Sequence, residues 1–101
     1  MQVLEVRKTD AFENWLTGLK DQRGKAKIVA RIDRLALGNP GDVAPVGEGV
    51  SELRIHFGPG YRVYFVRREK TIVVLLCGGD KGSQERDIAQ AKSLATELED
   101  E

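Results

Sequence analysis

The sequence predicts a single α+β domain in which a helical hairpin packs on one face of a small twisted sheet. Three observations lead to this class. Apolar residues recur at helical spacing in two neighbouring stretches near the N-terminus. Three β-rich runs follow, and the short connections 58–60 and 69–70 make them antiparallel neighbours in a meander. A last helical stretch completes the order β-α-α-β-β-β-α, which we expect to fill residues 1–101 as one unit.

The N-terminal part is expected to form one strand and two amphipathic helices. Residues 2–7 alternate in the manner of a short strand. Asp10, with Glu13 three positions later, has the spacing of a capping box for the first helix. The second helix is expected over about 22–37, where Gly38 supplies a C-terminal cap. The predicted core joins both helices to the sheet and contains Phe12, Trp15, Leu16, Ile28, Ile32, Leu53, Ile55, Val63 and Phe65.

The C-terminal part is expected to hold the sheet and one more helix. Glycine and proline are frequent in residues 39–51, which predicts a loop. Residues 52–57, 61–68 and 71–79 are rich in β-branched and aromatic side chains, and we expect each to be a strand. Ser83 has the position of an N-cap for a final helix that ends near residue 98.

Composition narrows the classes of function. One cysteine and one histidine make an intramolecular disulfide impossible and a zinc site of the His/Cys type improbable. The N-terminus lacks the apolar core of a secretory signal, and no apolar run reaches the length of a membrane span, so a cytoplasmic location is expected. Residues 1–96 carry sixteen cationic against twelve acidic side chains, a surplus that permits a polyanionic partner. The basic residues of the second helix are interpreted as a solvated face.

Alternation along the predicted strands gathers polar side chains on one face of the sheet. Leucine, isoleucine and phenylalanine in 52–57 point one way, while Arg54 and His56 point the other. Antiparallel pairing with the next strand then brings Arg62 and Tyr64 beside them. The sequence therefore predicts two arginines, a histidine and a tyrosine on one open face.

Two interpretations of this polar face are open. Like charges directly across a sheet cost up to roughly 1 kcal/mol, so the clustering is easier to accept if an anion normally sits among them. The alternative is an ordinary exposed face on which Glu52 and Glu69 balance the charge.

Three segments resemble a known family of bacterial toxins. They are "GDVAPVGEGVSELR", "ELRIHFGPGYRVYF" and "IVVLLCGGDKGSQERDIAQA". Together they look like the RelE/HigB group, and specifically its phage-related, addiction module killer protein branch. The resemblance extends from "FENWLTGLKD" to the last helix, so it covers essentially the whole chain. It implies a RelE-like fold, whose order of elements agrees with the order obtained above.

The resemblance implies the toxin of a type II toxin–antitoxin pair, a ribosome-dependent mRNA endoribonuclease that inhibits translation without a metal or other cofactor. Its implied partners are a helix-turn-helix, HigA-like antitoxin, the ribosome and mRNA. Arg62 matches the family's catalytic arginine, while Arg54 and His56 match basic positions of the preceding strand and Lys81 a basic position that closes the site. The implied RNA-binding residues are Tyr64, Arg54, Arg62 and Lys81.

Some features leave the function open. The family's best-known branch has a tyrosine in its last helix that stacks on a base, and residues 83–98 contain no aromatic side chain. Tyr64 is a candidate replacement, or an ordinary aromatic residue of the sheet. Two alternatives to the nuclease are a ParE-like inhibitor of DNA gyrase, which shares the fold and has no catalytic activity, and a decayed, non-toxic module that retains only its antitoxin contact.

Overall fold

The computed structural model describes residues 3–99. Its elements keep the predicted order, with one additional strand and a short 3-10 turn. In chain order they are β1 (Glu5–Lys8), α1 (Asp10–Gly18), α2 (Gln22–Ala36), β2 (Val43–Gly47), β3 (Val50–Ile55), β4 (Tyr61–Arg68), β5 (Ile72–Asp80), the 3-10 turn η1 (Lys81–Ser83) and α3 (Gln84–Glu99).

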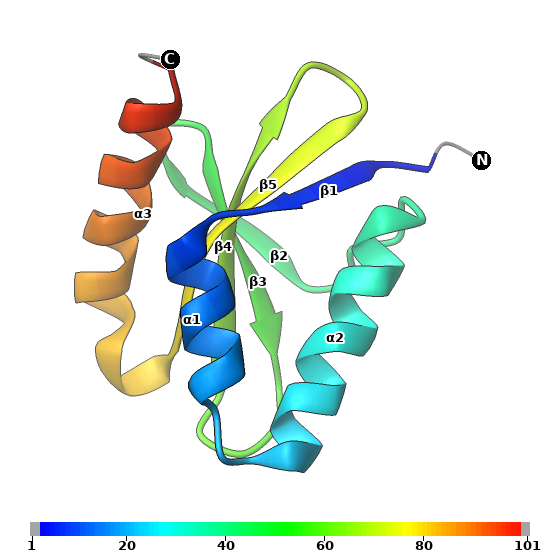
Figure 1. Ribbon diagram of the computed structural model, residues 1–101, viewed down its shortest axis with the longest axis vertical. Coiled ribbons are helices and arrows are strands. Elements are labelled where there is room, and N and C mark those ends of the chain that lie inside the picture. The colour runs from blue at the N-terminus through cyan, green and yellow to red at the C-terminus, as the bar shows by residue number, and fades with distance from the viewer. Residues whose placement is uncertain (1–2, 100–101) are drawn as a thin grey trace.

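The strands form a five-stranded sheet in the order β1-β5-β4-β3-β2 (Figure 1). The strands β3, β4 and β5 are the predicted antiparallel meander. The strand β1, the first element of the chain, pairs in parallel with β5 and forms one edge of the sheet. The fold is therefore α+β, as the sequence predicts.

The second edge strand was not predicted, because β2 falls within residues 39–51 that were assigned to a loop. Its partner is β3, and Pro45 lies opposite Ser51 in that antiparallel pair. Proline is tolerated there because an edge strand has one side free of ladder hydrogen bonds. The hairpin closes through Gly47, Glu48 and Gly49, whose positive φ angles of 106°, 55° and 80° explain the glycine-rich sequence.

The first helix also begins differently from the prediction. The side chain of Thr9, not that of Asp10, caps α1 by accepting a hydrogen bond from the Phe12 N–H at 3.0 Å. The Thr9 hydroxyl donates in turn to the Leu76 carbonyl at 2.5 Å, which ties the helix start to β5. The second helix ends as predicted, with Gly38 at a φ of 84°.

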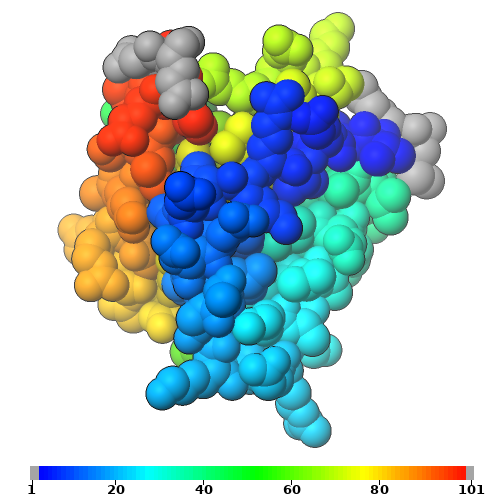
Figure 2. Space-filling view, in the orientation of Figure 1, coloured from blue at the N-terminus to red at the C-terminus, as the bar shows by residue number. Residues whose placement is uncertain are grey.

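One face of the sheet is covered by α1 and α2, and this face contains the predicted core. In the space-filling view the two helices lie side by side below β1 (Figure 2). Phe12 and Ile28 have no exposed surface, and Trp15 and Leu16 pack at the margin of the cluster. All nine residues of the predicted core belong to it. The helical hairpin and its apolar contacts are therefore confirmed.

The opposite face is covered in part by α3, which corrects the prediction of an open polar face. Ala91 and Ala95 of the helix pack on Tyr64 and Leu76, and Cys77 is buried in the same cluster. The unbroken apolar run of 72–77 is typical of a strand buried on both faces, and this signal points to the second layer. Within residues 3–99, no helix has the length and apolar character needed to cross a membrane.

Candidate functional site

A buried carboxylate, Glu52, lies at the centre of the polar part of the α3-covered face. Its side chain has no exposed surface. One oxygen, Oε1, accepts a hydrogen bond from Arg54 Nε at 2.9 Å. The other, Oε2, accepts from the Tyr64 hydroxyl at 3.0 Å and from Gln84 Nε2 at 2.7 Å. Arg62 Nε lies 3.8 Å from Oε1, so two arginines share one carboxylate.

Strand register produces this arrangement. Glu52 pairs with Tyr64 across β3 and β4, and Arg54 pairs with Arg62 one step further along the same face. The pairing of like charges that the sequence predicts is thus real, and Glu52 supplies the anion between them. Gln84, the first residue of α3, reaches the same carboxylate from the helix. The site therefore joins two strands to a helix terminus.

Two opposing effects act on the pKa of Glu52. Burial disfavours its charged form, but the hydrogen bonds from Arg54, Gln84 and Tyr64 and the positive charge of Arg62 outweigh burial and lower its pKa. The hydrogen bond to Glu52 raises the pKa of Arg54. The pKa of Tyr64 is also raised well above its usual value, mainly by burial and secondly by the hydrogen bond to Glu52. Glu52 is therefore ionised at neutral pH.

The side chain of Arg62 is almost fully buried, with 8% of its surface exposed. Its Nη1 donates to the carbonyl oxygens of Gly60 at 3.3 Å and Tyr61 at 3.2 Å. Its Nε has no hydrogen-bond partner, although Glu52 lies nearby. A guanidinium has five N–H donors in a planar fork. Arg62 is thus fixed in position by the chain while its donors are incompletely used.

A second carboxylate connects His56 to this cluster. Asp42 Oδ2 lies 2.5 Å from His56 Nε2, and Asp42 Oδ1 lies 3.9 Å from Arg54 Nη1. The hydrogen bond with His56 is the main reason that the pKa of Asp42 is lowered. The contacts form a row that runs from His56 through Asp42, Arg54 and Glu52 to Arg62. His56 is at its exposed end, since 68% of its side-chain surface is accessible.

Lys81 lies beside Arg62 at the other end of the cluster. A Cβ atom built on Gly60, which has a φ of 81°, would meet Lys81 Cβ at 3.5 Å and Arg62 Nη1 at 3.6 Å. Lys81 is exposed on η1 and borders a surface hollow of about 430 Å³ that also includes Gln84. The start of the Lys81 side chain therefore lies near Arg62, at the surface of the protein.

The structure thus brings Arg54, Arg62 and Tyr64 around Glu52, with His56 and Lys81 at opposite sides of that cluster. The stacking role expected for Tyr64 does not fit its position, because its ring has no exposed surface and its hydroxyl is bound to Glu52. Its position is that of an internal residue that holds the carboxylate. Within residues 3–99, no group of three or more His, Cys, Asp or Glu side chains is placed to hold a metal ion.

Of the acidic and amide groups at the centre of the site, the sequence indicates only Glu52, as a counter-charge in one of the two interpretations of the polar face. Glu52 has the same alternation phase as Arg54 and pairs with Tyr64 across the strands. Asp42 and Gln84 were not predicted in these roles. Asp42 and Gln84 lie just outside the two ends of the meander, 14 and 32 residues from their partners His56 and Glu52. Nothing local in the sequence indicates their contacts.

Comparison with known proteins places this geometry in a family. Residues 14–98 match the family model described as "Phage derived protein Gp49-like (DUF891)". An uncharacterized protein of Haemophilus influenzae is 53% identical over 95 residues, which cover 94% of this chain and 96% of that protein. The family match covers β3, β4 and all but the last residue of α3, and it includes the residues of the site. The chain therefore belongs to the Gp49-like family, a phage-derived, toxin-like family of the addiction module killer type.

Proposed function

We propose that this protein is the toxin of a type II toxin–antitoxin pair and that it cleaves mRNA on the ribosome in the manner of the RelE/HigB group. The observation that supports the proposal is the geometry of Arg62. It is a nearly buried guanidinium whose Nη1 is held by two backbone carbonyls and whose Nε lies near the Glu52 carboxylate, and the exposed Lys81 lies close by. Such a group is suited to bind a phosphate whose negative charge grows during a reaction.

The proposed reaction needs no group outside the protein and its RNA. A base removes the proton of the ribose 2′-OH, the oxygen attacks the adjacent phosphorus, and the bond from phosphorus to the 5′ oxygen breaks. The products are a 2′,3′-cyclic phosphate and a 5′-hydroxyl, which takes up a proton as it leaves. In this scheme Arg62 and Arg54 stabilise the charge on the phosphoryl oxygens. We assign Lys81, whose side chain starts near Arg62, a contact with the same phosphate.

His56 is the side chain in this row best suited to transfer protons at neutral pH. Its bond with Asp42 fixes the ring, and carboxylates orient catalytic imidazoles in the same way in other enzymes. We assign His56 the role of the acid or base at the exposed end of the row. The proposed partners are a small helix-turn-helix antitoxin of the HigA type and the translating ribosome with its mRNA.

The test compares two arginines of the same strand. Arg62→Ala is expected to reduce mRNA cleavage on translating ribosomes about 10²- to 10³-fold, as does the loss of other electrostatic donors. Arg62→Lys retains the charge but loses the planar fork, so it should lose part of that rate. Arg68→Ala, at the other end of β4, is the matched control and should leave the rate unchanged. Thermal melting of each variant separates activity from folding.

Two results would contradict the proposal. One is full cleavage by a folded Arg62→Ala protein, which would remove the assigned role of the guanidinium. The other is a wild-type protein that leaves mRNA intact and instead inhibits DNA gyrase, the activity of the ParE-like alternative.

A further inference from the structure

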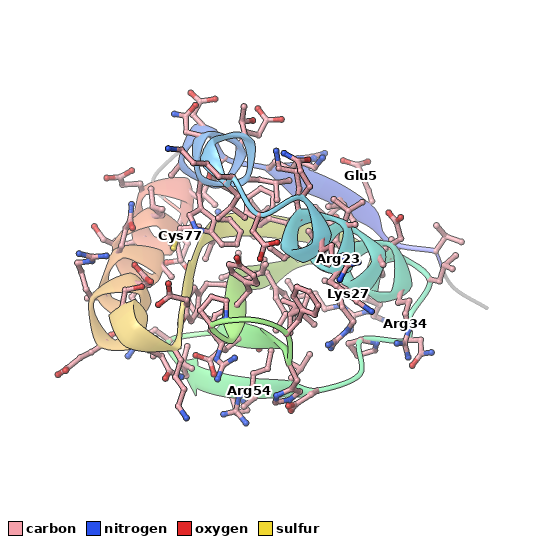
Figure 3. All side chains as sticks on the ribbon, turned by 90° about the horizontal axis from the view of Figure 1, so that it is seen from below. Glu5, Arg23, Lys27, Arg34, Arg54 and Cys77 are labelled. Atoms are coloured by element: carbon pink, nitrogen blue, oxygen red, sulfur yellow. The ribbon has the colours of Figure 1, made fainter. Side chains whose placement is uncertain are left out.

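A row of cations runs along α2, outside the site described above. It consists of Arg23, Lys27, Arg31 and Arg34 and is called the α2 cation row (Figure 3 labels Arg23, Lys27 and Arg34). At about 100° per residue, its members fall within about 80° of the helix circumference and extend over about 16 Å of its length. The single acidic residue within α2, Asp33, falls on another side of the helix. The sequence pattern was interpreted as a solvated face.

The α2 cation row is neutralised only in part by the protein, through the longer-range interactions of Asp21 with Arg23 and of Asp42 with Arg31. Among the described residues 3–99, no carboxylate forms an ion pair with any of its four members. Asp42 is the carboxylate at this edge of the sheet, and it is bound to His56 and Arg54. Parallel cations whose charge is only partly neutralised repel one another on a helix. An external polyanion would relieve this repulsion.

The row also borders a shaped surface. Lys27, Arg31, Arg34 and His56 line a hollow of about 360 Å³ together with the apolar residues Ala30, Ile55 and Phe57. Arg31 fixes its geometry, because Nη1 donates to the Arg54 carbonyl at 2.6 Å and Nη2 to the Pro40 carbonyl at 2.8 Å. Its Nε is buried without a partner. The charges left facing solvent are therefore those of Arg23, Lys27 and Arg34, on a helix anchored to β3.

We infer that the α2 cation row binds the phosphate backbone of folded, double-helical RNA and docks the protein on an RNA particle, separately from the site around Arg62. This extends the proposed function, which already takes RNA as the target. Phosphate binding requires only a line of cations on a rigid support. Lys27 lies 5.8 Å above the Phe57 ring, so that face of the ring is not free to stack on an unpaired base.

The surface fits RNA better than an acidic protein. Protein interfaces are anchored by apolar side chains in desolvated pockets. The large exposed apolar residues of the described chain are Val3, Val29 and Leu37, and none of them lines this hollow. Ile55 is buried already. The lining of the hollow is more apolar than polar, but it is far smaller than the roughly 800 Å² per partner that a stable protein interface buries. The cations around it can be used by a sugar–phosphate backbone without base recognition.

The test measures binding of a labelled RNA duplex of about 20 base pairs by fluorescence anisotropy, at several salt concentrations near 0.1 M. The charge reversal Lys27→Glu/Arg34→Glu is expected to weaken binding at least 10-fold and to reduce the slope of log K against log salt by about two, because two phosphate contacts are lost. The control Arg67→Glu/Lys70→Glu makes the same change of net charge in and beside the β4–β5 turn. It should stay within about twofold of the wild type.

Equal loss in both double variants would overturn the inference, because net charge alone would then explain binding. Tight binding of a poly-glutamate peptide to the row, equal to that of the duplex, would overturn it in favour of an acidic protein partner. Neutral variants at the same positions, Lys27→Gln/Arg34→Gln, replace the charge reversals if these unfold. Arg62→Ala separates the two proposals, since it should bind the duplex normally while losing cleavage. Normal duplex binding by the row variants would refute only this inference.

Discussion

The two faces of the sheet differ in what they bury. The face under α1 and α2 buries an apolar cluster whose one hydroxyl group, that of Tyr61, reaches Asp21 at its margin. The face under α3 buries a second, smaller apolar cluster and, beside it, the fully enclosed Glu52 and the nearly enclosed Arg62. Both faces are made by the same strands, since alternate residues of β3 and β4 point to opposite sides. Adjacent residues of one strand therefore belong to different clusters, one apolar and one that contains buried charges.

This difference separates stability from the chemistry of the site. An apolar face gains free energy from burial alone and needs no exact partner for each side chain. A buried carboxylate gains stability only while its hydrogen bonds are complete, because an unpaired buried charge is strongly destabilising. We therefore expect substitutions on the first face to change stability alone and substitutions on the second to change stability and site geometry together.

The largest loss of stability is expected on the apolar face. Phe12→Ala removes a fully buried ring and should lower the free energy of unfolding by about 3 to 5 kcal/mol. Urea denaturation measures this change. Val29→Ala, on the exposed side of α2, is the control and should stay within about 0.5 kcal/mol of the wild type. A loss below about 1 kcal/mol for Phe12→Ala would disprove the core assignment.

A smaller loss is expected at the centre of the polar face. Glu52→Gln keeps the shape of the side chain but turns an acceptor oxygen into a donor that faces other donors, so the free energy of unfolding should fall by about 1 to 3 kcal/mol. Cleavage activity should fall as well, because Arg54 and Arg62 lose their common anchor. Glu69→Gln, in the exposed β4–β5 turn, is the matched control. An equal effect of the two changes would contradict the special position of Glu52.

The part of this effect that depends on charge should vary with pH. Because folding lowers the pKa of Glu52, its ionised form contributes stability that is complete above the unfolded-state pKa near 4.5. That contribution is lost as the pH falls through the lower folded-state pKa. The difference in unfolding free energy between wild type and Glu52→Gln should therefore shrink in acid. Urea denaturation of both proteins between neutral pH and pH 3 measures it, and a difference that grows in acid would have the wrong sign.

The smallest change compares two tyrosines on opposite faces. Tyr64→Phe removes one donor to Glu52 while Gln84 and Arg54 remain, so the loss should be about 0.5 to 1.5 kcal/mol. Tyr61→Phe removes a 2.7 Å hydrogen bond to Asp21, the half-buried N-cap of α2. Its effect should be smaller, because water can replace the lost donor at Asp21. Thermal melts of both variants measure the two losses of stability. A larger loss for Tyr61→Phe than for Tyr64→Phe would contradict this prediction.

Most of the fold could be predicted from the sequence because its signals are local. Helical spacing in α1 and α2 and alternation in β3 and β4 identify the elements and one core. The strand β2 was missed because its glycines and proline resemble a loop, and only pairing with β3 makes Val43–Gly47 extended. The position of α3 over the second face depends on contacts with β4 and β5 that no helical pattern reveals.

The site could be predicted less completely, for a related reason. The Arg54 and Arg62 pair follows from strand register, which a short turn fixes. Glu52 shares the face of Arg54 through alternation in one strand, but the contacts of Asp42 and Gln84 depend on approaches between segments that are separated in sequence. Asp42 precedes an unpredicted strand, and Gln84 contacts Glu52 only because α3 docks on the sheet. For Tyr64 the sequence leaves an RNA contact and an ordinary place in the sheet both open, because its burial under α3 cannot be seen in the sequence.

The lone thiol of Cys77 gives the protein a built-in reporter. It is 2% exposed in the α3-covered cluster, it contacts the Asp87 carbonyl at 3.6 Å, and burial raises its pKa to about 12. Both enclosure and the scarcity of thiolate protect it from alkylating reagents. Labelling therefore requires α3 to move away from the sheet. The rate of thiol modification would measure the rate of that opening without any engineered cysteine. The same helix holds Gln84 against Glu52, and the labelling rate would thus report how often the site itself comes apart.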